Sequence, residues 1–203
     1  MKPHQIKWRK RFAAGLLLLL LSSGRVLLHG QETPASDAIA PSFAFAGVDY
    51  FHRWSKDGQH EFTPRGQENL DKWSDMLTVN VYSDAHDGDA LAAKANAVLE
   101  NYKAHDGRVV RTNSVPRTPD RAAEHFIVVV FGRPSFIEVA FNRFKLVEGI
   151  GCSITYSHRF YGAKVGNQVS EWLNQNGPNL EKMLMEWDRL PSPDLLSKLS
   201  QKK

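Results

Sequence analysis

Residues 136–161 read FIEVAFNRFKLVEGIGCSITYSHRFY, and this stretch decides the fold. Glu148-Gly149 at its centre is a typical two-residue turn between antiparallel strands. The flanking segments Phe136–Val147 and Ile150–Tyr161 alternate in character, as the two faces of a strand require. The sequence therefore predicts a long β-hairpin.

This turn also fixes which residues lie opposite each other. His158 falls on an apolar face and Arg159 on a polar face, so the run SHR cannot act as one catalytic cluster. We expect His158 to be a hydrogen-bonded core residue. The expected apolar face pairs Ile137 with Phe160, Val139 with His158 and Phe141 with Tyr156; the polar face pairs Glu138 with Arg159, Ala140 with Ser157 and Asn142 with Thr155.

The polar face has two interpretations. Glu138 and Arg159 can form a structural ion pair, a cross-strand contact that contributes about 0.2–1 kcal/mol. Alternatively, the face is a ligand-binding floor on which Arg159 holds a carboxylate or phosphate, since guanidinium geometry suits both. The candidate binding residues on this floor are Glu138, Asn142, Thr155, Ser157 and Arg159.

The rest of the chain adds strands and helices around this hairpin. We expect a first hairpin at 49–64 with KDG as its loop and Ser55 facing Gln59. Further strands are expected at 76–82, 108–114 and 125–131, and helices at 63–73, at 87–104 (capped by Asp87 or Asp89), and on each side of a break at 176–178. The order ββαβαββββαα, with its tight turns, predicts an α+β fold with a largely antiparallel sheet flanked by helices.

The N-terminus looks like an export signal. Five basic residues precede the apolar run Phe12–Leu21, which is too short to cross about 30 Å of hydrocarbon as a helix. We expect a signal peptide at 1–30, a flexible leader at 31–47, one domain at 48–190 and a polar, frayed tail at 191–203. An uncleaved N-terminal anchor is the alternative; after cleavage we expect no stable membrane span.

Export changes the charge of the mature chain. The 203 residues carry a net charge of +4, but residues 1–30 contain six basic residues and no acidic ones. The remainder has 20 basic and 22 acidic residues, a net charge of −2. Nucleic-acid binding thus loses its electrostatic support. Cys152 is the single cysteine, and we expect it to be buried.

Two histidines in the first hairpin, His52 and His60, are further candidates for a binding site. Glu61 adjoins them, but the spacing matches no standard metal motif. The acidic run DAHDGD at 84–89 lacks the glutamate that completes a calcium loop. We therefore expect neither a metal nor a cofactor.

Four segments carry a resemblance to known proteins. They read EFTPRGQENLDKWSDM (61–76), ANAVLENYKA (95–104), AEHFIVVVF (123–131) and YSHRFYG (156–162). Over residues 48–188 the chain resembles an uncharacterised family of exported bacterial proteins. Its element order is similar to the PsbP-like α/β/α sandwich, which implies a binding or accessory role and supplies no catalytic residues.

Together these observations predict an exported, non-enzymatic accessory or binding protein of the cell envelope, periplasmic or secreted. Its partner would be an envelope protein or a small anionic ligand. The alternative is an envelope hydrolase or transferase whose polar pocket uses His52, His60, Glu138 and Arg159.

Overall fold

The computed structural model describes residues 43–199, and eight strands and three helices lie within this range. The strands form one sheet in the order β1-β2-β3-β4-β8-β7-β6-β5, with every neighbouring pair antiparallel. The α+β class is confirmed. The elements are β1 Phe43–Phe45, β2 Val48–Lys56, β3 Gln59–Pro64, β4 Asp75–Tyr82, α1 Gly88–Ala104, β5 Gly107–Val115, β6 Glu124–Gly132, β7 Phe136–Val147, β8 Ile150–Tyr161, α2 Gly166–Glu186 and α3 Pro193–Ser197.

The central hairpin β7–β8 has the predicted register. Glu138 pairs with Arg159, Val139 with His158 and Asn142 with Thr155. Its turn consists of Glu148 and Gly149, whose φ angles of 50° and 78° match the mirror-image turns that fit twisted strands. The alternation of residue types was therefore sufficient to place both faces of this hairpin.

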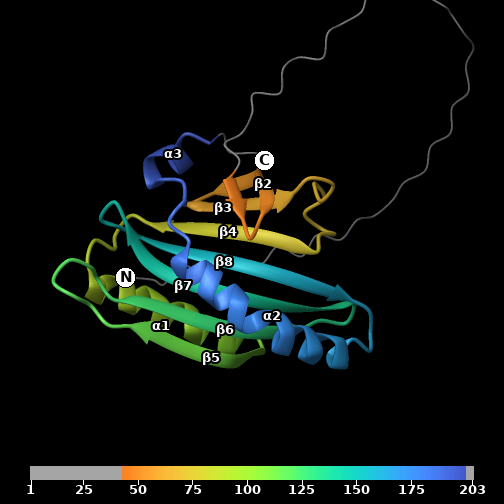
Figure 1. The fold of residues 1–203 in the computed structure, drawn as a ribbon. Coiled ribbons are helices and arrows are strands. Elements are labelled where there is room, and N and C mark those ends of the chain that lie inside the picture. Colours follow the sequence, from red (N-terminus) through yellow and green to blue (C-terminus); the bar gives the residue numbers. More distant parts are fainter. Residues whose placement is uncertain (1–42, 200–203) are drawn as a thin grey trace, which may run out of the picture. The chain divides into compact units, whose positions relative to one another are not determined.

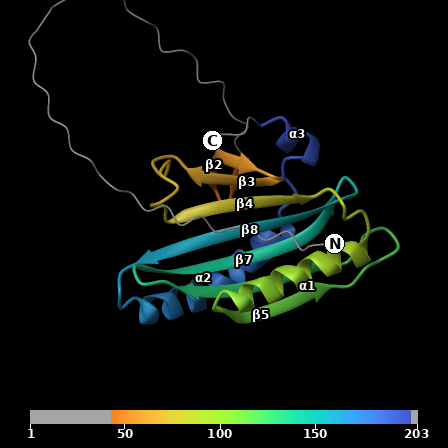
Figure 2. The same cartoon turned by 180° about the vertical axis from the view of Figure 1, so that it is seen from behind.

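The two faces of the sheet are covered differently. Helix α2 crosses one face, and α1 lies on the opposite face over β5, β6 and β7 (Figures 1 and 2). Under α2 lies the larger apolar cluster, which includes Phe62, Leu77, Phe141 and Ile154. Beneath α1 lies a smaller cluster around Leu91 and Phe144, and the strands β8, β4 and β3 continue past the edge of this helix.

Helix α1 is capped by Asp87, one of the two residues expected to do so. The Asp87 side chain accepts a hydrogen bond from the Ala90 N–H at 2.8 Å, which satisfies one free amide of the first turn. Leu91 and Ala95 are buried on the inner side. At the other end Asp106 and Gly107 leave the helix, and β5 follows at once.

The predicted helix at 63–73 is wrong. Pro64 is the last residue of β3, and a loop stabilised by polar side chains follows it. Thr63 Oγ1 donates to the Gln67 carbonyl at 2.6 Å, while Gln67 Oε1 accepts from the amides of Ser74 and Asp75. These bonds give the backbone an alternative to a helical turn; short polar side chains such as Thr often do this, and here Gln67 does so as well.

The predicted register of the first hairpin is also wrong. Its turn is Asp57-Gly58, with φ of 50° and 81°, and Lys56 pairs with Gln59. A β-bulge at Arg53 shifts the register between His52 and Trp54. Asp-Gly is the stronger hairpin signal in KDG, and a bulge cannot be read from the alternation alone.

The chain's last elements differ from the expected break and frayed tail. Helix α2 continues through Pro178 to Glu186, and α3 follows with Ser192 as its cap and Leu196 fully buried. At the other end, β1 lies within the segment that was expected to be a flexible leader, and it pairs with β2. The packed domain therefore extends beyond 48–190 in both directions, whereas the predicted signal peptide at 1–30 lies outside the described residues.

Candidate functional site

The ion pair between Glu138 and Arg159 forms the centre of the polar face. Arg159 Nε donates to Glu138 Oε2 at 2.9 Å, and the side chains of Arg159 and Glu138 are only 12% and 11% exposed. The guanidinium lies 3.7 Å from the ring centroid of Trp73 and 4.3 Å from that of Phe136. Cation–π contacts of this kind are strongest when desolvated. Arg159 is thus held firmly by its own chain.

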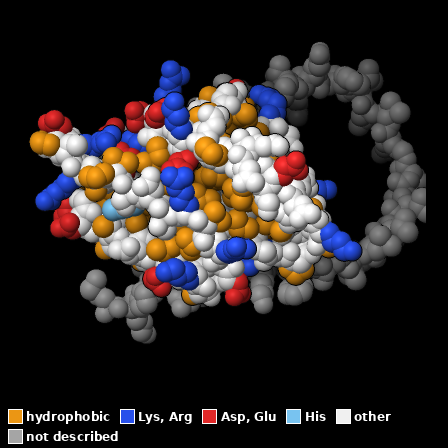
Figure 3. Space-filling model, turned by 60° about the horizontal axis from the view of Figure 1, so that its bottom comes forward, with side chains coloured by type: hydrophobic (Ala, Val, Ile, Leu, Met, Phe, Trp, Pro, Cys, Tyr) orange, Lys and Arg blue, Asp and Glu red, His pale blue; other side chains and the backbone are white. Residues whose placement is uncertain are grey.

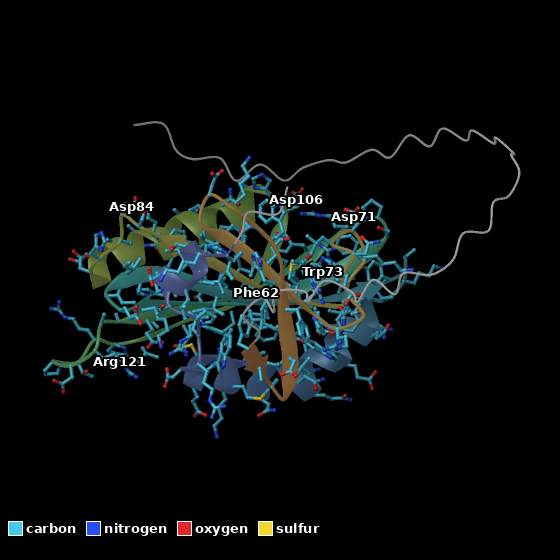
Figure 4. All side chains as sticks on the ribbon, turned by 90° about the horizontal axis from the view of Figure 1, so that it is seen from above. Phe62, Asp71, Trp73, Asp84, Asp106 and Arg121 are labelled. Atoms are coloured by element: carbon cyan, nitrogen blue, oxygen red, sulfur yellow. The ribbon has the colours of Figure 1, made fainter. Side chains whose placement is uncertain are left out.

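Trp73 reaches this position from the loop between β3 and β4. Tyr161 Oη accepts from the Trp73 N–H at 3.0 Å and donates to its carbonyl at 2.8 Å, and Arg159 N–H donates to the Ser74 carbonyl. Figure 4 shows Trp73 nearer the middle of the molecule than Asp71, which lies at the periphery. The loop that replaces the predicted helix therefore closes over the ion pair.

A buried polar layer adjoins the pair under α1. Asn142, Thr155 and Ser157 are each less than 9% exposed. Asn142 Nδ2 donates to Tyr102 Oη of α1 at 2.9 Å, whereas Asn142 Oδ1 has no hydrogen-bond partner among the described residues. Burial raises the pKa of the Tyr102 hydroxyl above its usual range. The five predicted floor residues thus lie together, but below the surface.

The accessible part of this face lies beside that layer, on strands β2, β3 and β4. Gln59 Nε2 donates to Glu61 Oε1 at 2.9 Å. Burial raises the pKa of Glu61, and the charge of Glu138 adds to this effect, while the Gln59 bond and Arg159 oppose it. We call this surface the open face; its partly exposed side chains are Phe51, Trp54, Gln59, Glu61, Thr78 and Asn80.

His52 and His60 lie on the other side of the sheet. Their ring centroids are 5.9 Å apart, both are buried, and His52 packs against Phe62 of the apolar cluster. Burial lowers the pKa of His60. The sheet therefore separates these histidines from Glu138 and Arg159. Glu61 also faces away from them, and the described residues contain no group of three metal-ligating side chains.

His158 is a hydrogen-bonded residue of the apolar face, as expected. Its Nδ1 lies 2.7 Å from Asp75 Oδ1, and its ring stacks on Trp172 of α2 at 4.7 Å. Burial opposes ionisation of Asp75, but hydrogen bonds from His158 and Tyr156 outweigh it and hold the pKa of Asp75 below its usual value. Asp75 is the first residue of β4, one position before the predicted strand, so its pairing with His158 could not be read from the sequence. Cys152 is buried, as predicted.

Sequence reasoning missed a pocket of about 410 Å³ at the C-terminal end of α2. Its deepest side chain is Arg143, which is 3% exposed and pairs with Glu124 at 2.7 Å. The sequence did contain a sign of this site: the predicted register puts Arg143, a charged residue, on the apolar face of its strand. The lining residues are Arg121, Ala122, Glu124, Arg143, Lys145, Leu146, Met185, Glu186 and Asp188.

A further surface feature is an apolar area on the lower side of Figure 1, where α2 and β5 lie. Figure 3 brings this side forward and shows hydrophobic side chains across its middle, with charged side chains around them. Val110 of β5 is 53% exposed. Because apolar atoms supply more than half of an ordinary protein surface, this area alone does not identify a site. Among the described residues, none of the helices has the length and apolar character needed to cross a membrane.

Comparisons with known proteins give a family but no activity. No curated protein matches the chain. Among solved structures, the Ran-binding protein Mog1p of Saccharomyces cerevisiae is 12% identical with a TM-score of 0.37, covering 74% of this chain and 82% of its own. Human STARD10 is 12% identical with a TM-score of 0.26, covering 68% and 74%. A family model matches residues 38–188, and the chain therefore belongs to this uncharacterised protein family.

Proposed function

We propose that this protein is an exported accessory or binding protein of the cell envelope, without a catalytic centre of its own. In this proposal it holds a protein partner on the open face of its sheet. The observation that carries the proposal is the combination of partly exposed aromatic and amide side chains, such as Trp54 and Gln59, on strands anchored in a rigid sheet.

The open face suits a polar partner better than a small anion. Glu61 is the one charged side chain among the six that define the open face, and when ionised it repels an anion placed beside it. Trp54 and Phe51 offer aromatic area, and the amides of Gln59 and Asn80 can exchange hydrogen bonds with a peptide. No described helix lies over this part of the sheet (Figure 2). A protein segment is therefore the proposed partner.

Export is supported by the sequence of residues 1–30, with its basic start and short apolar run. The resemblance to exported bacterial proteins also supports export. The resemblance to PsbP-like sandwiches supports the binding role, because such domains serve more often in binding than in catalysis. The proposed location is the periplasm or the external medium.

The alternative, a hydrolase or transferase, has less support. It requires His52 or His60 within hydrogen-bond reach of Glu138 or Arg159. These two pairs of residues project from opposite faces of one sheet, with the backbone between them. A pocket made from all four would require the sheet to come apart.

Site-specific photo-crosslinking in the envelope of a bacterial host tests the binding role. A crosslinking residue at Gln59 or Thr78 is expected to give one discrete adduct, which Trp54→Ala weakens. The same residue at Lys182, exposed on α2, is the control and should give none. Adducts of equal strength at all three positions, or none at the open face, would contradict the proposal.

Export is tested separately with a reporter enzyme that is active only after export, such as alkaline phosphatase. A fusion to residues 1–42 should be active, and a fusion without residues 1–30 should be inactive. An inactive fusion to residues 1–42 would contradict the envelope location, whatever the crosslinking result.

A further inference from the structure

The pocket at the end of α2 is built around Arg143, which is held by hydrogen bonds but keeps two N–H groups without a partner in the described part of the chain. Arg143 Nε donates to Glu124, and its Nη1 donates to the carbonyls of Leu184 and Trp187 at 2.8 and 2.9 Å. Leu184 lies in the last turn of α2 and Trp187 is the residue that caps it, so Arg143 binds carbonyls at the helix end, where few backbone partners are available. Three of the five N–H groups are thereby committed, and the guanidinium is fixed in place.

The two remaining N–H groups of Arg143, both on Nη2, have no partner within residues 43–199. Nη2 has no hydrogen-bond partner among these residues, yet it is not one of the fully buried polar atoms that lack one. It therefore keeps some exposed surface, which faces the pocket that Arg143 lines. These two N–H groups diverge from one nitrogen, so Nη2 can donate a charge-assisted hydrogen bond to one carboxylate oxygen, while the other oxygen is left for a neighbouring cation.

A carboxylate of the chain itself already lies in the field of this pocket. Asp188 follows α2, and its Oδ1 accepts from Lys145 Nζ at 3.0 Å. The bond and charge of Lys145, with the charges of Arg143 and Arg121, hold the pKa of Asp188 below its usual range. Its side chain is nonetheless 79% exposed. Three cations thus surround one exposed, loosely held anion.

We propose that this pocket binds the carboxylate of a small organic acid, which takes the place of Asp188 among these cations. With Asp188 moved aside, the lining carries the three cations and two acids, Glu124 and Glu186, a net charge of +1. A monocarboxylate neutralises this charge, whereas a phosphate dianion exceeds it. The carboxylate meets Arg143 Nη2 and Lys145 Nζ.

The remaining lining selects for an apolar substituent on the acid. Ala122 and Met185 contribute hydrocarbon surface, and 410 Å³ is within the usual range for small-molecule sites. Arg121 enters from the loop before β6, at the periphery of the molecule (Figure 4). Displacement of Asp188 costs little, because an ion pair with a solvent-exposed carboxylate is weak.

Titration calorimetry of the purified protein with hexanoate tests this site, with hexanamide as the uncharged control. Hexanoate is expected to bind saturably and hexanamide not to bind. Asp188→Asn removes the competing carboxylate and should tighten hexanoate binding roughly two- to fivefold, the factor that an exposed ion pair provides. Arg121→Gln should weaken it by a similar factor, and Arg108→Gln on β5 should leave it unchanged.

The position of binding is read from the NMR signal of Arg143 Nε–H, which should shift with hexanoate alone. Binding without that shift, equal binding of hexanamide, or an unchanged affinity in Asp188→Asn would each overturn the inference. Equal binding of inorganic phosphate would overturn the carboxylate assignment. No detectable hexanoate binding would leave Arg143 with only its structural role at the end of α2, and the proposed partner on the open face would be unaffected.

Discussion

At the residue scale, the molecule buries two arginines on opposite faces of β7 and β8 and satisfies both in the same way. Arg159 pairs with Glu138 between two aromatic rings, and Arg143 pairs with Glu124 against carbonyls of α2. A buried charge without a partner is costly, so removal of one member of such a pair is far more damaging than removal of both. Both pairs therefore constrain the sheet.

The Glu138–Arg159 pair gives a first prediction. Arg159→Met leaves Glu138 buried without its cation and should lower the free energy of unfolding by about 3–5 kcal/mol. The double variant Glu138→Leu/Arg159→Met should lose much less, which urea unfolding of the unchanged protein and the two variants measures. Lys103→Met, which breaks an exposed pair with Glu100, is the control and should change little. Equal losses in the single and double variants would contradict this account.

Glu61 gives a prediction for pH dependence. Its folded-state pKa is raised, chiefly by burial, so the folded protein favours the protonated form. This contribution to stability is complete below the pKa of the unfolded chain, near 4.5, and is lost as the pH rises through the higher folded pKa.

Glu61→Gln should therefore stabilise the protein at pH 7 and have little effect at pH 3.5, and the Gln59 hydrogen bond can be retained. Denaturant unfolding at both pH values measures the difference. Glu171→Gln, at an exposed position of α2, is the matched control and should show no such dependence. A Glu61→Gln protein that is less stable at neutral pH would show that ionised Glu61 is favoured in the fold.

At the element scale, α2 shows how packing outweighs a helix-breaking sequence. Pro178 lies inside the helix, where it removes one backbone hydrogen bond. Gly177 precedes it and has no Cβ to meet the proline ring. Asn176 Nδ2 donates to the Trp172 carbonyl at 3.0 Å, and Leu180 is buried on the next turn. Burial of the apolar stripe on both sides keeps the helix continuous.

The same geometry predicts the effect of changing this segment. Pro178→Ala restores a backbone donor and should raise the free energy of unfolding, by up to about 3 kcal/mol. Gly177→Ala should add about 0.5–1 kcal/mol in that background, since a Cβ there would lie 3.9 Å from Leu173 and Phe141. In the presence of Pro178 the same change should give no gain. Thermal unfolding of the four proteins measures the cycle, and a gain from Gly177→Ala in both backgrounds would refute the pre-proline argument.

At the scale of the whole molecule, the two ends of the described chain complete the core under α2. Trp187 packs on Phe43 and Phe45 of β1, with ring centroids 5.2 Å apart in both cases. Leu196 of α3 belongs to the same apolar cluster as Phe62 and is fully buried. In both ribbon views α3 lies at the end of the molecule that carries β2 and β3 (Figures 1 and 2). The C-terminal segment is thus part of the fold.

This arrangement predicts a strong effect at a position expected from the sequence to lie in a frayed tail. Leu196→Ala should lower the free energy of unfolding by about 2–5 kcal/mol, the usual cost of a buried leucine. Its neighbour Leu195 is 52% exposed, and Leu195→Ala should change stability by less than about 0.5 kcal/mol. Urea unfolding distinguishes the two, and equal, small effects would mean that α3 does not hold the core together.

Local patterns determined the parts of this protein that depend on near neighbours. Alternation along 136–161 gave both faces and the register of β7–β8, because the Glu148-Gly149 turn fixes the partner of every residue. The cap of α1 followed from a similarly short-range rule, which left Asp87 and Asp89 as the two candidates. The α+β class followed from the order of the elements, although one expected helix was absent.

The tertiary structure decided what the sequence left open. Whether Gln67 would hold a loop, whether α2 would pass through Pro178, and whether α3 would pack all depend on contacts with residues distant in the chain. The site had the same limit: the sequence predicted the Glu138–Arg159 pair, but not that Trp73 would cover it or that the sheet would separate it from His52. Hydrophobic periodicity indicates on which face of its own strand or helix a side chain lies. Which other elements pack against that face is determined by contacts between residues distant in the chain.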